Sequence, residues 1–276
     1  ITLFIFSHCT EIIDDYELND DQNERLIVDG RITDEQKPHK ITLSKTSSYF
    51  YNERTPRVSD AEVTISDGEN VFPLTETTPG EYETAPDVAG EPAKTYTLNI
   101  TLQDGEKYTA SSYMKPLYPM DSLGYEYYKD PFGGDFFYKI YVFAQERPGI
   151  GDCYMWDYYL DSELKSDTLN EKSLVDDEMY DGKYIHHADI FWIPEYEITK
   201  EKTRLTVKMY SISEEYFDFY IALMHETDWR GGPFDGPSAN VPSNISNEAL
   251  GFFYASSVSY STVDVLYQQS KYKMGE

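Results

Sequence analysis

The stretch Thr95-Tyr96-Thr97-Leu98-Asn99-Ile100-Thr101-Leu102 alternates polar and apolar side chains without a break. A period of two puts every second side chain on one face of a β-strand, so the apolar set faces a core while the threonines face solvent. Asp104-Gly105 follows, and Lys107-Tyr108-Thr109-Ala110 resumes the strand pattern. Because glycine adopts the positive φ of a tight turn, this segment predicts two antiparallel strands joined as a hairpin.

Similar short strand patterns lie N-terminal to this hairpin. They cover Leu26–Thr33, Lys40–Ser44, Ala61–Ile65 and Val71–Leu74, and turn residues separate them. Six or seven such strands within about ninety residues predict a Greek-key sandwich of immunoglobulin-like or transthyretin-like type. We expect it to span residues 26–117, because the prolines of Lys115-Pro116-Leu117-Tyr118-Pro119 mark a boundary.

Residues 118–276 predict a larger β-rich domain with one amphipathic helix. The strand patterns in this part lie at Phe136–Phe143, Tyr154–Leu160, Ile190–Ile193, Arg204–Tyr210 and Leu250–Val258. A helix is expected at about residues 213–226, where Ser211-Ile212-Ser213-Glu214 has the form of a capping box. Apolar side chains then recur every three or four residues from Tyr216 to Met224, which predicts one face packed against a sheet.

The charge of the chain excludes two classes of partner. Its 276 residues contain 23 Lys and Arg against 50 Asp and Glu, a net charge of -27. Such a surface repels phosphate backbones, so general nucleic-acid binding and adsorption to anionic lipids through a basic patch are excluded. The aromatic share of 16% excludes a disordered acidic chain.

The first residues predict a lipid anchor. Ile1-Thr2-Leu3-Phe4-Ile5-Phe6-Ser7-His8-Cys9 is a short apolar run that ends at a cysteine, as in the remnant of a lipoprotein signal peptide that is cleaved before a lipidated Cys9. Residues 10–35 then hold ten acids, which favours an extended, solvated tether. We therefore interpret residues 1–25 as signal remnant, lipidation site and tether. The alternative is a first β-strand that contains a cysteine.

The sequence offers no catalytic, metal or cofactor constellation. The segment Asp176–Gly182 resembles a calcium loop, but Met179 interrupts its alternate ligands, so we expect a polar hairpin with its turn at Asp181-Gly182. His186 and His187 are adjacent and would point to opposite faces of a strand. Cys153 stands in an aromatic stretch and is expected to be buried. No nucleophile elbow or phosphate loop is found, so no cofactor is expected and the protein is expected not to be an enzyme.

Aromatic side chains and one long loop are the candidates for binding. Trp156, Tyr158, Trp192 and Trp229 could stack on sugar rings or against a partner protein, although core packing is the alternative for each. Residues 230–247 form a loop rich in Gly, Pro and Asn, and loops of this kind often carry function. The candidate residues for binding a partner or ligand are Trp229, Phe234, Asp235, Asn240 and Asn244.

Several segments in order resemble the Bacteroidota lipoproteins known as domain of unknown function 4249. They cover the chain from about residue 26 to 266 and comprise Leu26–Asp34, Ile41–Thr46, Val58–Ile65, Pro79–Tyr82, Gly105–Tyr108, Pro233–Pro237 with Asn240 and Ser243–Ile245, and Gly251–Phe253. The resemblance implies an outer-membrane lipoprotein, exposed at the cell surface and lipidated at Cys9. It also implies an N-terminal immunoglobulin-like module, and a place beside TonB-dependent transporters. The family carries no established catalytic residues.

Three functional hypotheses follow. The first is a non-catalytic, surface-anchored binding or accessory subunit of a TonB-dependent nutrient transporter, with a transporter barrel and a glycan or peptide ligand as partners. The second is a surface hydrolase of glycans or peptides that uses an Asp or Glu pair in the C-terminal domain. Two carboxylates facing each other across an open cleft would favour this hypothesis. The third is a structural or adhesive surface protein, which a flat face without a pocket would favour.

Overall fold

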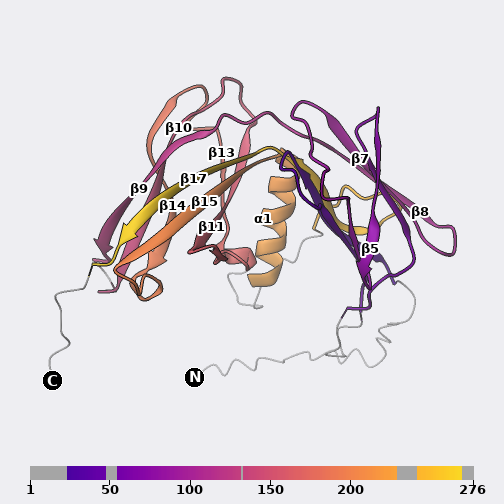
Figure 1. Cartoon of the computed structure of the whole chain (residues 1–276), viewed down its shortest axis with the longest axis horizontal. Coiled ribbons are helices and arrows are strands. Elements are labelled where there is room, and N and C mark those ends of the chain that lie inside the picture. The colour runs from indigo at the N-terminus through magenta and orange to yellow at the C-terminus, as the bar shows by residue number, and fades with distance from the viewer. Residues whose placement is uncertain (1–23, 48–54, 132, 229–240, 269–276) are drawn as a thin grey trace, which may run out of the picture.

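The computed structural model describes residues 24–47, 55–131, 133–228 and 241–268. Strands dominate this part of the chain and form four sheets, and α1 (Glu214–Asp228) is its one α-helix. The predicted mainly-β class is therefore confirmed. The sheets pair into two sandwiches, which lie on either side of α1 and meet at the top of the view in Figure 1.

The first sandwich contains the hairpin expected from the alternating stretch. Leu98 of β7 (Thr95–Thr101) is paired with Ala110 of β8 (Lys107–Tyr113). One sheet has the order β4-β3-β7-β8, with β3 at Glu62–Ser66 and β4 at Val71–Pro73. The other has the order β16-β1-β2-β6-β5, with β1 at Leu26–Thr33, β2 at Lys40–Lys45, β5 at Thr75–Thr78, β6 at Glu81–Glu83 and β16 at Leu250–Ser256.

The core of this sandwich is built from alternate residues of facing strands. Val28, Ile41, Ile65, Leu98 and Phe253 are fully or almost fully buried between the two sheets. Their neighbours along each strand point outward, as the period-two pattern requires.

Strand β16 returns to the first sandwich from the far end of the sequence. It pairs parallel to β1, with Val28 opposite Gly251. The single final strand expected at Leu250–Val258 is in fact two strands, because the chain leaves β16 at Ser257 and enters β17 (Val258–Leu266) in the second sandwich. The Ser257 hydroxyl donates to the Lys115 carbonyl at 2.7 Å, so the two crossings between the sandwiches are bonded to each other.

In the second sandwich, a three-stranded sheet packs against a five-stranded sheet. The three-stranded sheet has the order β14-β10-β9, with β9 at Met120–Lys129, β10 at Phe136–Gln145 and β14 at Tyr184–Pro194. The five-stranded sheet has the order β12-β11-β15-β17, with β13 also paired to β11; its bounds are β11 Cys153–Leu160, β12 Glu163–Leu164, β13 Ser173–Asp176 and β15 Lys202–Ile212. Two short 3-10 turns, η1 (Leu169–Glu171) and η2 (Glu195–Glu197), connect these strands.

The helix joins the two sandwiches through a third apolar cluster. Tyr216 and Tyr220 of α1 pack with Phe252 and Tyr254 of β16 and with Tyr210 of β15. The helix cap differs from the expected one by two residues. The Ser213 hydroxyl, not that of Ser211, accepts the Tyr216 N–H at 3.2 Å, because Ser211 still belongs to β15.

Candidate functional site

A groove of about 680 Å³ lies where α1 meets the outer face of the first sandwich. We call it the junction groove. Its volume is within the range of roughly 300–1,000 Å³ that is typical of ligand sites. It is lined by Ile27, Val28, Asp29, Gly30, Arg31, Lys40 and Thr42 of β1 and β2 or next to them, by Asp167–Leu169 and Lys172, by Tyr216, Phe219, Tyr220 and Leu223 of α1, and by Val241, Leu250, Gly251, Phe252 and Tyr254.

Strand alternation decides which side chains reach the groove. Along β1, Leu26, Val28 and Ile32 are buried in the core of the first sandwich. The residues between them, Ile27 and Arg31 among others, point to the opposite face and line the groove. The same rule divides β16, whose Phe253 enters the core while Phe252 and Tyr254 face α1.

An aromatic cluster forms one wall of the groove. Tyr216 stacks on Tyr254 with ring centroids 3.9 Å apart, and it meets Phe252 edge-on at 5.3 Å. Phe219 lies 5.1 Å from Phe252 and is partly exposed to the groove. Burial raises the pKa of both tyrosines, so each keeps its hydroxyl proton. The wall therefore consists of apolar ring faces, and its two tyrosine hydroxyl groups are neutral.

A guanidinium anchors this wall from the side of β1. Arg31 Nη1 donates to the Tyr254 hydroxyl at 2.9 Å, and the guanidinium carbon lies 5.2 Å from the ring centroid of Tyr210. The hydrogen bond fixes the Arg31 side chain relative to Tyr254, and the cation–π contact fixes it relative to Tyr210.

A buried carboxylate fixes the loop on the other side of the groove. Asp157 is only 2% exposed and accepts from the Ser166 hydroxyl at 3.0 Å. Lys172, which lines the groove, forms an ion pair with the same carboxylate. The segment from Ser166 to Lys172 is thereby tied to β11.

The rim carries charges of both signs. Asp29, Lys40 and Asp167 are exposed there, and Lys40 forms an ion pair with Glu81 at 2.7 Å. The junction groove thus combines apolar ring faces with a polar, charged rim. This chemistry suits a ligand that has both apolar faces and hydroxyl or amide groups.

Most of the site residues predicted from the sequence are not among those that the structure describes. Cys9, Trp229, Phe234, Asp235 and Asn240 lie outside the described residues, so the predictions made for them stay predictions.

Asn244 is described and lies beside β16. Its side-chain oxygen accepts the Phe253 N–H at 3.0 Å, and its amide donates to the Phe253 carbonyl at 2.7 Å. A further bond reaches the Ser111 carbonyl at 3.3 Å. Asn244 therefore pairs like a strand residue at the free edge of β16, and this bonding uses both ends of its amide.

The predicted aromatic residues divide between core and surface. Trp156 and Tyr158 are buried in the second sandwich. Trp192 is half exposed on the outer face of β14, where Lys139 Nζ lies 4.4 Å from its ring centroid and Tyr128 packs edge-on at 5.6 Å. Cys153 is buried as expected, and burial raises the pKa of its thiol to about 12, which makes it unreactive at neutral pH.

The junction groove was not predicted from the sequence. Its walls come from β1, near the start of the described chain, and from α1 and β16, near its end, and nothing local to one segment reveals that they meet. One signal was present. Asp29 and Arg31 place charges on the outward face of a strand whose other face is apolar, next to Ile27 on the same outward face.

Comparison with known proteins gives one informative match. The family model described as "Domain of unknown function (DUF4249)" matches residues 13–262. A search of curated proteins found no match. Among solved structures, a chain of a cytokine receptor complex (crystal form 1A) is 8% identical; the match covers 89% of this chain and 98% of that one, with a TM-score of 0.26. A likeness with so low a TM-score supports no conclusion about fold or function.

Proposed function

We propose that this chain, which belongs to the DUF4249 family because the family model matches residues 13–262, is a non-catalytic binding subunit that captures a ligand in its junction groove. The groove itself is the observation that carries the proposal. It has the volume of a ligand site, one aromatic wall and a charged rim, and its walls are fixed by the bonds of Arg31 and Asp157. A preformed site of this kind binds without the cost of ordering its own side chains.

The ligand class follows from the lining. Partly exposed Phe219 and Leu223 can cover an apolar face of a ligand, while Asp29, Thr42 and Asp167 can bond to its polar edge. A glycan fragment and a short peptide both meet these requirements. A highly anionic ligand does not, because the protein carries a net charge of -27.

The lining of the groove favours binding without catalysis. The carboxylates that line it are Asp29 and Asp167, and both are exposed to solvent. A glycosidase holds its general acid in an apolar pocket and opposes it with a second carboxylate across the scissile bond.

The location and the partner of the binding subunit rest on the sequence. A lipid on Cys9 would anchor the chain to the outer membrane, and the acidic residues 10–35 would act as a tether that lets the sandwiches reach a partner. Among the described residues, no helix has the length and apolar character needed to span a bilayer. In this account the partner is a TonB-dependent outer-membrane transporter, to which the captured ligand is passed.

A groove-filling substitution tests the site. Thr42 lies on the outer face of β2 and lines the groove, so Thr42→Trp should fill part of it. Thr64 occupies the equivalent outward position on β3 in the opposite sheet, which makes Thr64→Trp the matched control. Both variants and the wild type are screened against arrays of glycans and of short peptides.

We expect ligands that bind the wild type and Thr64→Trp, and that bind Thr42→Trp at least about tenfold more weakly. The class of array on which they appear identifies the ligand. Ligands that bind all three proteins equally would contradict the assignment of the groove, and turnover of a bound glycan or peptide would contradict a non-catalytic role.

A further inference from the structure

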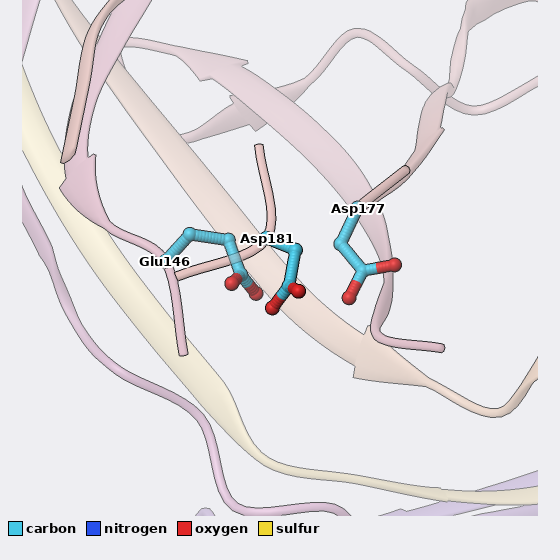
Figure 2. A group of neighbouring side chains, drawn as sticks. All are labelled: Glu146, Asp177 and Asp181. Carbon is cyan, nitrogen blue, oxygen red and sulfur yellow. The ribbon is translucent and has the colours of Figure 1, made fainter. Parts of the chain in front are cut away.

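Three carboxylates converge at one end of the second sandwich, away from the junction groove. Glu146 directly follows β10, Asp177 follows β13, and Asp181 lies in the turn that precedes β14. One oxygen from each lies within 4.8 Å of the other two. Figure 2 shows the three carboxylates side by side.

Burial makes this arrangement unusual. Glu146 and Asp177 are each only 2% exposed. The Oδ2 atom of Asp177 is buried and has no hydrogen-bond partner in the described part of the chain. Buried carboxylate oxygens almost always have a partner, because the cost of leaving one unsatisfied is high. Asp177 therefore brings an unsatisfied oxygen to a group of three neighbouring carboxylates, and a bound cation would satisfy it.

The loop before β11 holds two of the carboxylates in place. Asp177 Oδ1 accepts the Gly151 N–H at 3.0 Å, and Asp181 Oδ1 accepts the Gly149 N–H at 2.6 Å. Gly149 has a φ of 120° and Gly151 a φ of 107°, a backbone conformation that other residues rarely adopt. The backbone of this loop thus orients one oxygen of each aspartate.

Glu146 is held in the same way. Its Oε2 accepts the Gly182 N–H at 2.9 Å and its Oε1 accepts the Tyr154 hydroxyl at 2.8 Å. All three carboxylates are therefore oriented by neutral donors before any ligand binds.

The nearby basic side chains bind a different acid. Arg147 makes a two-pronged contact with Asp152, at 2.6 and 3.0 Å, and Lys115 Nζ lies 3.4 Å from the same carboxylate. Among the described residues, no Lys or Arg forms an ion pair with Glu146, Asp177 or Asp181. The three carboxylates thus have neutral donors but no counter-ion.

We propose that Glu146, Asp177 and Asp181 bind one Ca²⁺ ion. An all-carboxylate set without His or Cys selects a hard cation over zinc. Oxygens that share one Ca²⁺ at 2.3–2.6 Å can lie up to about 5 Å apart, and the observed spread fits this limit. Ca²⁺ also accepts irregular geometry, which suits ligands from three separate loops better than the strict octahedron of Mg²⁺.

The bound ion would brace one end of the second sandwich. It would join the segments after β10 and β13 to the turn before β14, and through Gly149 and Gly151 it would also fix the loop before β11. The Asp176–Gly182 segment thus supplies only two of the ligands. The third comes from Glu146, which lies too far away in the sequence to belong to the same calcium loop.

The test compares the full-length protein with and without Ca²⁺. The protein is stripped with a chelator, dialysed into about 0.15 M KCl to screen surface charges, and titrated with Ca²⁺ by calorimetry. We expect one ion per chain, and a melting temperature about 5 °C higher in saturating Ca²⁺ than in chelator. Asp177→Asn and Asp181→Asn should each weaken Ca²⁺ binding at least about tenfold.

Glu178→Gln is the matched control, because Glu178 is an exposed acid in the same turn and is not part of the cluster. It should leave Ca²⁺ affinity unchanged. In chelator, Asp177→Asn should melt at or above the wild-type temperature, because it removes repulsion between carboxylates, and this result shows that the variant folds.

Two results would overturn the proposal. The first is a wild-type melting temperature that does not respond to Ca²⁺. The second is an equal loss of affinity in Glu178→Gln and Asp177→Asn, which would indicate diffuse surface binding.

Discussion

Gly251 and Val28 face each other across the parallel pair β16 and β1, so closely that a Cβ atom on Gly251 would lie 1.9 Å from the Val28 carbonyl oxygen. Gly251 also has a φ of +90°. This contact closes the first sandwich with a strand from the far end of the chain, and it sets the position of Phe252 and Tyr254 in the junction groove. Only glycine fits here, for reasons of both space and backbone conformation.

Gly251→Ala should therefore destabilise the protein by about 3 kcal/mol or more, because a new methyl group must displace backbone rather than a flexible side chain. Urea unfolding followed by circular dichroism measures the change. Gly68→Ala is the control, since Gly68 has the same φ of +90° but no atom within 4 Å of the added Cβ. It should cost only about 1 kcal/mol. Equal costs would show that the close contact contributes nothing.

His39 should make the first sandwich sensitive to mild acid. The side chain is 2% exposed, and burial, together with the charge of Lys37, lowers the pKa of its imidazole to about 4. Between pH 6.5 and 4 the unfolded chain then binds more protons than the folded one, so stability falls as the pH falls through this window. The loss attributable to His39 reaches about 3 kcal/mol at pH 4.

Comparison with His39→Gln isolates this effect from that of the many carboxylates. The variant should lose part of its stability at pH 7, because the Thr33 N–H now bonds to the His39 Nδ1 atom at 3.3 Å. It should nevertheless lose less stability than the wild type between pH 6.5 and 4, when chemical unfolding is measured across that range. Parallel pH profiles for the two proteins would exclude His39 as the cause.

The alternation of single strands was enough to predict much of the fold. The hairpin of β7 and β8, the mainly-β class and the helix all follow from local periodicity in segments such as Thr95–Leu102 and Tyr216–Met224. The return of β16 to β1 could not be predicted in this way, because pairing between residues more than two hundred positions apart leaves no local pattern. The helix cap was misplaced for a smaller reason, since Ser211 and Ser213 are both suitable caps and only the length of β15 decides between them.

The sites were harder to predict than the fold. Composition directed attention to the Gly- and Pro-rich loop 230–247, of which the described part, Asn244 included, bonds to β16 and β8. The junction groove and the acidic cluster both combine residues from separate strands and loops. In a chain with 50 acidic residues, no local spacing distinguishes Glu146 as the partner of Asp177 and Asp181.

Lipidation of Cys9 can be tested independently of the structure. Metabolic labelling with a fatty-acid analogue should tag the full-length wild type and the variant Cys153→Ser, but not Cys9→Ser. Cys153 is a suitable control because its thiol is buried. Since two or three acyl chains are needed for stable anchoring, Cys9→Ser should also move from the membrane fraction to the soluble fraction. Equal labelling of the two cysteine variants would exclude Cys9 as the lipidated residue.

We propose that the protein serves as a binding subunit at the outer membrane, and purification from membranes is the decisive test of this role. The tagged full-length chain is extracted in mild detergent, purified, and the proteins that accompany it are identified by mass spectrometry. We expect a TonB-dependent outer-membrane transporter to co-purify with the wild type in a fixed ratio. Repeated recovery of the chain alone, from membranes in which the transporter is present, would contradict it.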